Sequence, residues 1–78
     1  MSKSLRQIAS GEKAIVTAVL AEGEVGRRLR DMGLSPGTEI KILGRAPLKD
    51  PVSIRLRNYT LTLRNSEADF IMVKKVEA

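Results

Sequence analysis

The chain has 78 residues, a formal net charge of +5, 42% hydrophobic and 29% charged residues, and neither histidine nor cysteine. This length and composition predict one globular domain, residues 1–78. Without imidazole or thiol groups, the chain lacks the usual neutral-pH acid–base group and the usual transition-metal ligands, so we expect no enzyme, no cofactor and no metal site.

The apolar runs are also informative about location. None approaches the roughly 20 residues needed to cross a bilayer. The start, Met1 to Ser4, lacks the apolar stretch of a signal peptide. We therefore expect a cytoplasmic protein that does not insert into a membrane. Because we expect no enzyme, we also expect no small-molecule substrate.

The N-terminal third predicts one turn of helix and one strand. Leu5 and Ile8 stand three residues apart, which suits a single helical turn ended by Gly11. The β-branched, apolar run at residues 14–20 predicts a buried strand, and Gly23 ends it.

Residues 27–37, with the sequence RRLRDMGLSPG, predict a short helix that turns sharply into a strand. Val25, Leu29 and Met32 share one helical face. Gly33 suits the left-handed position that closes a helix, and the next residue, Leu34, would then contact Leu29.

The next two glycine and proline positions predict a turn. Pro36 and Gly37 fit the second and third positions of a type II turn. Each of these residues therefore has a structural reason to be in this stretch.

The rest of the chain predicts strands with alternating apolar residues. The expected strands are residues 38–43, 52–57, 59–64 and 70–76, with a loop at 44–51 and a single helical turn at 67–69. Asn58 is expected at the tip of a tight hairpin, because asparagine tolerates positive φ. Tyr59, Leu61 and Leu63 are expected to face inward.

Together these elements predict a mostly β fold: a small five-stranded SH3-like barrel. It has one short inserted α-helix and single-turn helices near the N-terminus and before the last strand. Five short strands are too few for a two-sheet sandwich, so a small bent barrel fits the count best.

The order of these motifs resembles the FeoA family, small cytoplasmic accessory proteins of bacterial ferrous-iron uptake. The resemblance is carried by Arg28-Leu29 before the segment 32–37, by Ala46-Pro47-Leu48 with Asp50-Pro51, and by Leu63-Arg64 with Glu67-Ala68. It implies an SH3-like barrel without enzymatic activity that works beside FeoB, the membrane iron permease with a cytoplasmic GTP-binding domain.

We expect the helical corner and the following loop to form the surface that contacts this partner. An aliphatic spot with an arginine rim has the composition of a small docking patch. The candidate partner-binding residues are Arg28, Leu29, Met32, Leu34, Arg45, Pro47 and Asp50.

Leu29 itself allows two interpretations. A leucine on the apolar face of a helix is core by default. If Leu29 were instead an exposed anchor, a polar replacement would leave the fold stable and weaken partner binding.

Nucleic-acid binding is the alternative function. Arg55, Arg57 and Arg64 would line one outer sheet face, joined by Lys74 and Lys75. However, Tyr59 and Phe70 are the only aromatic residues, so a stacking platform for bases and an aromatic groove for proline-rich peptides are both missing.

The acidic residues do not predict a metal site. Asp50, Glu67 and Asp69 are dispersed in sequence. Local capping of a loop or turn is the more economical role for them.

Overall fold

The computed structural model describes residues 3–45 and 51–76. Six antiparallel strands form one sheet in the order β1-β6-β2-β3-β4-β5. The elements in chain order are β1 (Lys3–Ser4), η1 (Leu5–Gln7), β2 (Lys13–Val19), α1 (Gly23–Asp31), β3 (Glu39–Arg45), β4 (Val52–Leu56), β5 (Tyr59–Leu63), α2 (Asn65–Ala68) and β6 (Ile71–Lys75).

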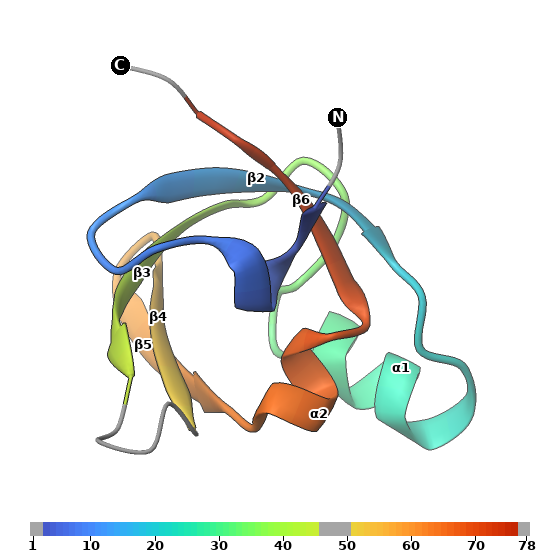
Figure 1. The fold of residues 1–78 in the computed structure, drawn as a ribbon. Helices are drawn as coiled ribbons and strands as arrows, with labels where there is room; N and C mark the ends of the chain where they lie inside the picture. Colours follow the sequence, from blue (N-terminus) through green and yellow to red (C-terminus); the bar gives the residue numbers. More distant parts are fainter. Residues whose placement is uncertain (1–2, 46–50, 77–78) are drawn as a thin grey trace.

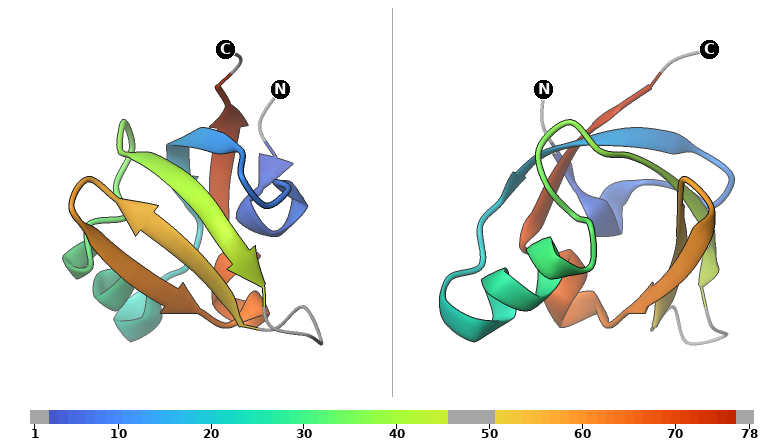
Figure 2. Two further views of the ribbon diagram at one scale, coloured as in Figure 1. Left: turned by 90° about the vertical axis from the view of Figure 1, so that its left-hand side faces the viewer. Right: turned by 180° about the vertical axis from the view of Figure 1, so that it is seen from behind.

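The sheet curls around the core, and α1 and α2 lie together at one end of it (Figure 1, Figure 2). Two register shifts, between Val16 and Ala18 in β2 and between Ile42 and Gly44 in β3, accompany this curvature. Such bulges increase local twist and bend a strand. The predicted mostly β, SH3-like fold is confirmed, although the sheet remains open, with β1 and β5 as its end strands.

The strand count differs from the prediction by one. Lys3 pairs with Val73 and Ser4 with Met72, which makes β1 a sixth, two-residue strand. Two residues carry no alternation that could mark them as a strand, so only the pairing with β6 defines this element.

The core is built from the alternation that the sequence predicts. In β3 and β4 the inward residues are fully buried and their neighbours are not. The buried apolar side chains are Leu5, Ile8, Ala14, Val16, Ala21, Leu29, Leu34, Ile40, Ile42, Val52, Ile54, Leu56, Leu63, Ala68, Ile71 and Val73. Each buried leucine, isoleucine or valine side chain contributes about 1.5–3 kcal/mol relative to leaving it in water.

The hairpin between β4 and β5 corrects two predictions. Leu56 pairs with Tyr59, which leaves Arg57 and Asn58 in the loop, and the positive φ falls on Arg57 (39°) rather than on Asn58. Tyr59 was expected to face inward but is 43% exposed. The strand register, which local sequence does not reveal, decides both outcomes.

Candidate docking surfaces

Helix α1 ends in a closed corner. The amide of Leu34 donates to the carbonyl of Leu29 (3.1 Å), and the amide of Gly33 donates to Arg30 (2.9 Å). Gly33 has φ +101°. This is the hydrogen-bond pair of a Schellman motif, with glycine at the left-handed position, so the predicted helix end is confirmed.

The chain then turns and joins the sheet at once. The amide of Thr38 donates to the carbonyl of Ser35 (3.0 Å) across Pro36 and Gly37, and Gly37 has φ +96°. Gly37 donates to Val16, and Val16 donates to Thr38, both at 2.8 Å. The chain therefore makes a turn at Pro36 and Gly37, where the sequence predicts one.

Tyr59 holds the corner from the other side. Its hydroxyl donates to the carbonyl of Met32 at 2.6 Å. A Cβ on Gly33 would overlap that same hydroxyl. Glycine at this position suits the positive φ, and any larger residue would also have to displace the Tyr59 hydroxyl.

Burial decides between the two interpretations of Leu29. Leu29 and Leu34 are both 0% exposed and belong to the core. Their prediction as exposed contact residues is wrong, because they fill the space beneath the corner. Met32 is half-buried and packs against the same core.

Arg28 lies on the outside of the corner and pairs with Glu67 of α2. The other carboxylate oxygen of Glu67 accepts the Arg64 amide at the start of α2 (3.1 Å). Arg28 therefore ties α1 to α2, while its side chain remains largely exposed.

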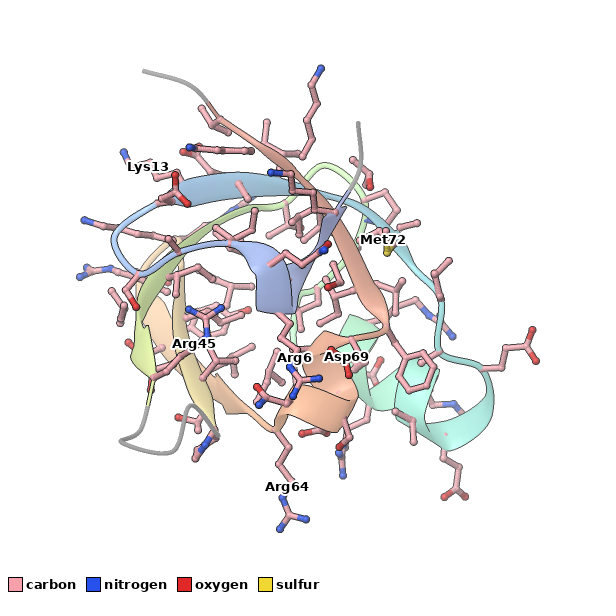
Figure 3. All side chains as sticks on the ribbon, viewed as in Figure 1. Arg6, Lys13, Arg45, Arg64, Asp69 and Met72 are labelled. Carbon is pink, nitrogen blue, oxygen red and sulfur yellow. The ribbon has the colours of Figure 1, made fainter. Side chains whose placement is uncertain are left out.

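Arg45 has a structural role that its sequence position did not suggest. Its guanidinium donates to the carbonyls of Arg6 (2.9 Å) and Ile8 (2.7 Å), which fixes η1 against the end of β3. Figure 3 shows Arg45, Arg6 and Asp69 on one side of the molecule, where Arg6 and Asp69 pair at 3.2 Å. Pro47 and Asp50 lie outside the described residues.

An exposed apolar pair lies where β2 ends and β6 begins. Leu20 is 57% exposed and Phe70 46% exposed, and the Leu20 amide donates to the Phe70 carbonyl (2.7 Å). We call these two residues the Leu20–Phe70 pair. Neither was predicted as a contact residue, because the sequence predicts each of them as the end residue of an apolar strand.

The basic residues proposed for nucleic-acid binding do not gather as one surface. Arg55 and Arg57 line a groove on the sheet. Arg64 precedes α2 and points away from the body of the protein (Figure 3). Lys75 pairs with Glu12.

The Glu12–Lys75 pair perturbs a titration. The hydrogen bond with Lys75, followed by that from the Ala9 amide (2.9 Å), holds the pKa of Glu12 below its ordinary value. Both interactions favour the ionised carboxylate.

Two kinds of feature are absent from residues 3–45 and 51–76. No three acidic side chains come together there as metal ligands. No helix in that part of the chain is long and apolar enough to cross a membrane.

Comparison with known proteins covers almost the whole chain. The model of the FeoA domain matches residues 3–75. A fusion protein of Fe(2+) transport protein A and the Fe(2+) transporter FeoB from Porphyromonas gingivalis is 31% identical over 74 residues. This match spans 95% of the present chain and 9% of the fusion protein's length.

Solved structures give the same picture. A FeoA-like protein from Clostridium acetobutylicum has 40% identity and a TM-score of 0.90, over 99% of this chain and 90% of that one. FeoA from Stenotrophomonas maltophilia, complexed with zinc and described as a prokaryotic SH3 domain protein, has 26% identity and a TM-score of 0.82, over 92% and 89%. The chain thus belongs to the FeoA family of ferrous-iron transport accessory proteins.

Proposed function

We propose that this protein is a non-enzymatic cytoplasmic accessory that docks on the cytoplasmic, GTP-binding part of a FeoB-type permease and modulates it. The observation that supports this best is the relative in which the two proteins are fused in one polypeptide. Fusion gives two modules a high effective concentration, which is useful when they act by contact.

The Leu20–Phe70 pair is the apolar centre of the proposed docking surface. Aromatic side chains are favoured anchors at interfaces, and Phe70 is the only phenylalanine of the chain. The Phe70 amide donates to the carbonyl of Glu67 (3.2 Å), and Glu67 pairs with Arg28. The contact would therefore include α2 and the outer side of α1.

We place the predicted contact residues that are still partly exposed at the border of this surface. Arg28 and Met32 lie at least partly exposed at α1. Arg45, Pro47 and Asp50 stay predictions, since the first holds η1 and the other two lie outside the described residues.

The test is calorimetric titration of the domain with the cytoplasmic part of a FeoB-type permease, with and without GTP, at low salt. Leu20→Ser with Phe70→Ser is expected to weaken binding by about a hundredfold, the loss of two buried anchors. Leu43→Ser is the control, because Leu43 is 44% exposed and lies on β3, outside both helices.

Absence of any binding by the unaltered domain, with and without GTP, would contradict the proposed function. Equal weakening by Leu43→Ser and by the double variant would contradict the choice of surface.

A further inference from the structure

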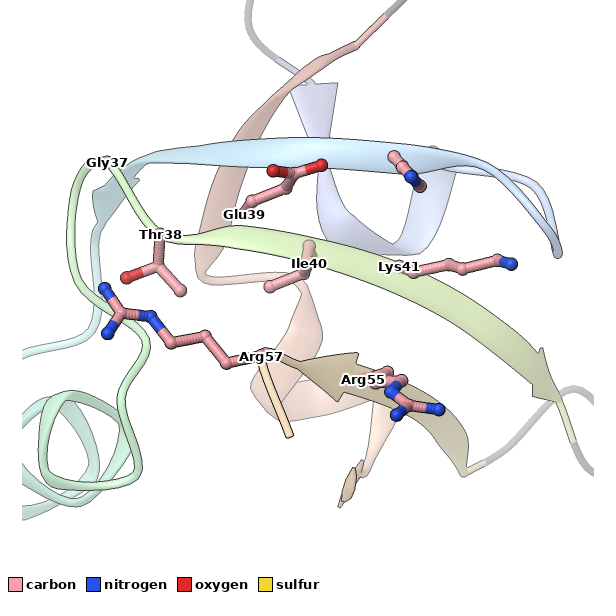
Figure 4. Close-up of a pocket in the computed structure, with 8 residues that line it drawn as sticks. Gly37, Thr38, Glu39, Ile40, Lys41, Arg55 and Arg57 are labelled. Carbon is pink, nitrogen blue, oxygen red and sulfur yellow. The ribbon is translucent and has the colours of Figure 1, made fainter. Parts of the chain in front are cut away.

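The outer face of strands β2, β3 and β4 carries a groove of ≈ 610 Å³. Its lining comprises Lys13, Gly37, Thr38, Glu39, Ile40, Lys41, Arg55 and Arg57, so four cations face one carboxylate. Figure 4 shows Lys41 and Arg55 extending to the same side and Arg57 reaching back toward Thr38. The volume falls within the range of ligand-binding pockets.

The cations are placed directly opposite one another. Lys13 pairs in register with Lys41, and Lys41 with Arg55, so three positive side chains follow one row across three strands. Strands lie about 4.8 Å apart, and like charges directly opposite are destabilising. The row therefore lowers the stability of the free domain.

No ion pair relieves this repulsion within the described part of the chain. Arg6, Arg28 and Lys75 each pair with a carboxylate there. Lys13, Lys41, Arg55 and Arg57 do not pair with any carboxylate of residues 3–45 or 51–76. The groove thus gathers four cations that have no ion pair with the described residues.

Arg57 adds a second, independent cost. It is the only non-glycine residue with positive φ among the described residues. A left-handed conformation costs a side chain with a Cβ roughly 1–2 kcal/mol. Strained residues cluster at functional sites, and here the strain places a guanidinium at the end of the groove.

From these features we infer that the groove is a binding site for an acidic, extended segment of the partner protein. This inference rests on the proposed function and names a second contact, separate from the Leu20–Phe70 pair. Carboxylates would lie between the cations, and each arginine offers a planar fork for bidentate hydrogen bonds. Binding would remove the like-charge repulsion that the free domain carries.

The lining favours a protein segment over other anions. No aromatic ring lines the groove, so bases of single-stranded nucleic acid have no surface on which to stack. A flat bilayer surface does not fit into a groove, whereas an extended chain can follow one.

The test uses Lys41→Glu, which places a carboxylate between Lys13 and Arg55. The unfolding midpoint should rise or stay constant, while affinity for the cytoplasmic part of the permease falls by about tenfold or more at 50 mM salt. Raising the salt to 200 mM should lower the affinity of the unaltered domain for the permease more than it lowers the affinity of the variant. Lys3→Glu makes the same charge change on β1, outside both the groove and the Leu20–Phe70 contact, and should alter affinity by less than about twofold.

The outcomes separate the two proposals. If the unaltered domain binds the permease and Lys41→Glu binds it as well as Lys3→Glu does, the groove is not the contact, although the proposed function stands. If the unaltered domain does not bind, both proposals fail. Two further arms use a 20-nucleotide single-stranded RNA and phosphatidylserine vesicles. The inference would be overturned if Lys41→Glu abolished binding of the RNA or of the vesicles but left binding of the permease unchanged.

Discussion

Arg28 at the helical corner differs from the cations of the sheet groove in having a carboxylate partner. At the corner, Arg28 is paired with Glu67, and the loop after α1 is tied to β2 and β5 by hydrogen bonds. In the groove, Lys13, Lys41 and Arg55 stand in one row without an ion pair within the described residues.

This difference distinguishes residues that hold the fold together from residues that a partner could contact. The corner is the most conspicuous stretch of the sequence, yet its leucines are core and its glycines serve the backbone. The groove is inconspicuous in sequence, because its cations come together only through strand pairing.

The largest expected effect concerns the corner's core. Leu29→Ala should lower the free energy of unfolding by about 2–5 kcal/mol, because it leaves a cavity beneath α1. Urea denaturation measures this. Leu20→Ala is the control and should stay within about 0.5 kcal/mol, because Leu20 is 57% exposed. Equal effects would mean that the corner is not core.

The next effect separates φ from close packing at Gly33. Gly11→Ala, with φ +88° and open space around it, should cost about 1 kcal/mol. Gly33→Ala should cost about 1–3 kcal/mol more, because its Cβ also meets the Tyr59 hydroxyl. Thermal unfolding compares them, and identical costs would show that Tyr59 moves away freely.

At Arg57, at the end of the groove, a glycine should be more stable than an alanine, the same order as at Gly11 and Gly33. Arg57→Gly should stabilise the domain by about 1 kcal/mol relative to Arg57→Ala, since only glycine relieves the positive φ. Both variants remove the same charge, so their difference in urea denaturation isolates the backbone. An alanine variant as stable as the glycine variant would argue against strain at this turn.

The smallest effect concerns a paired cation beside the groove. The pKa of Glu12 is lowered mainly by Lys75, so the pair stabilises the fold above the carboxyl's unfolded pKa of about 4.3. This stabilisation is lost as the pH falls through the lower folded pKa. Glu12→Gln should therefore be less stable than the unaltered domain at pH 7, and the difference should shrink as the pH falls below the unfolded pKa. A difference that persists unchanged at pH 3 would contradict this assignment.

Local rules predicted the corner well. The end of α1 depends on Leu29, Gly33 and Leu34, which are close in sequence, and the turn depends on Pro36 and Gly37. Such motifs form their hydrogen bonds within a few consecutive residues, so the local sequence is enough to predict them. The alternation in β3 and β4 likewise predicted the buried residues.

Features that depend on strand register were missed. Strand β1 exists only because Lys3 and Ser4 meet β6, and the positive φ moved from Asn58 to Arg57 because Leu56 pairs with Tyr59. The groove was grouped wrongly for the same reason, since Lys13 and Lys41 are 28 positions apart in sequence but directly opposite in the sheet.

The most direct test of docking is a chemical-shift perturbation map of the isotope-labelled domain with the cytoplasmic part of a FeoB-type permease added at low salt. The account predicts shifts in two places, around Leu20 and Phe70 and along the groove at Lys41 and Arg55, while the buried β4 residue Ile54 stays unchanged. A spectrum without any change, with and without GTP, would contradict it.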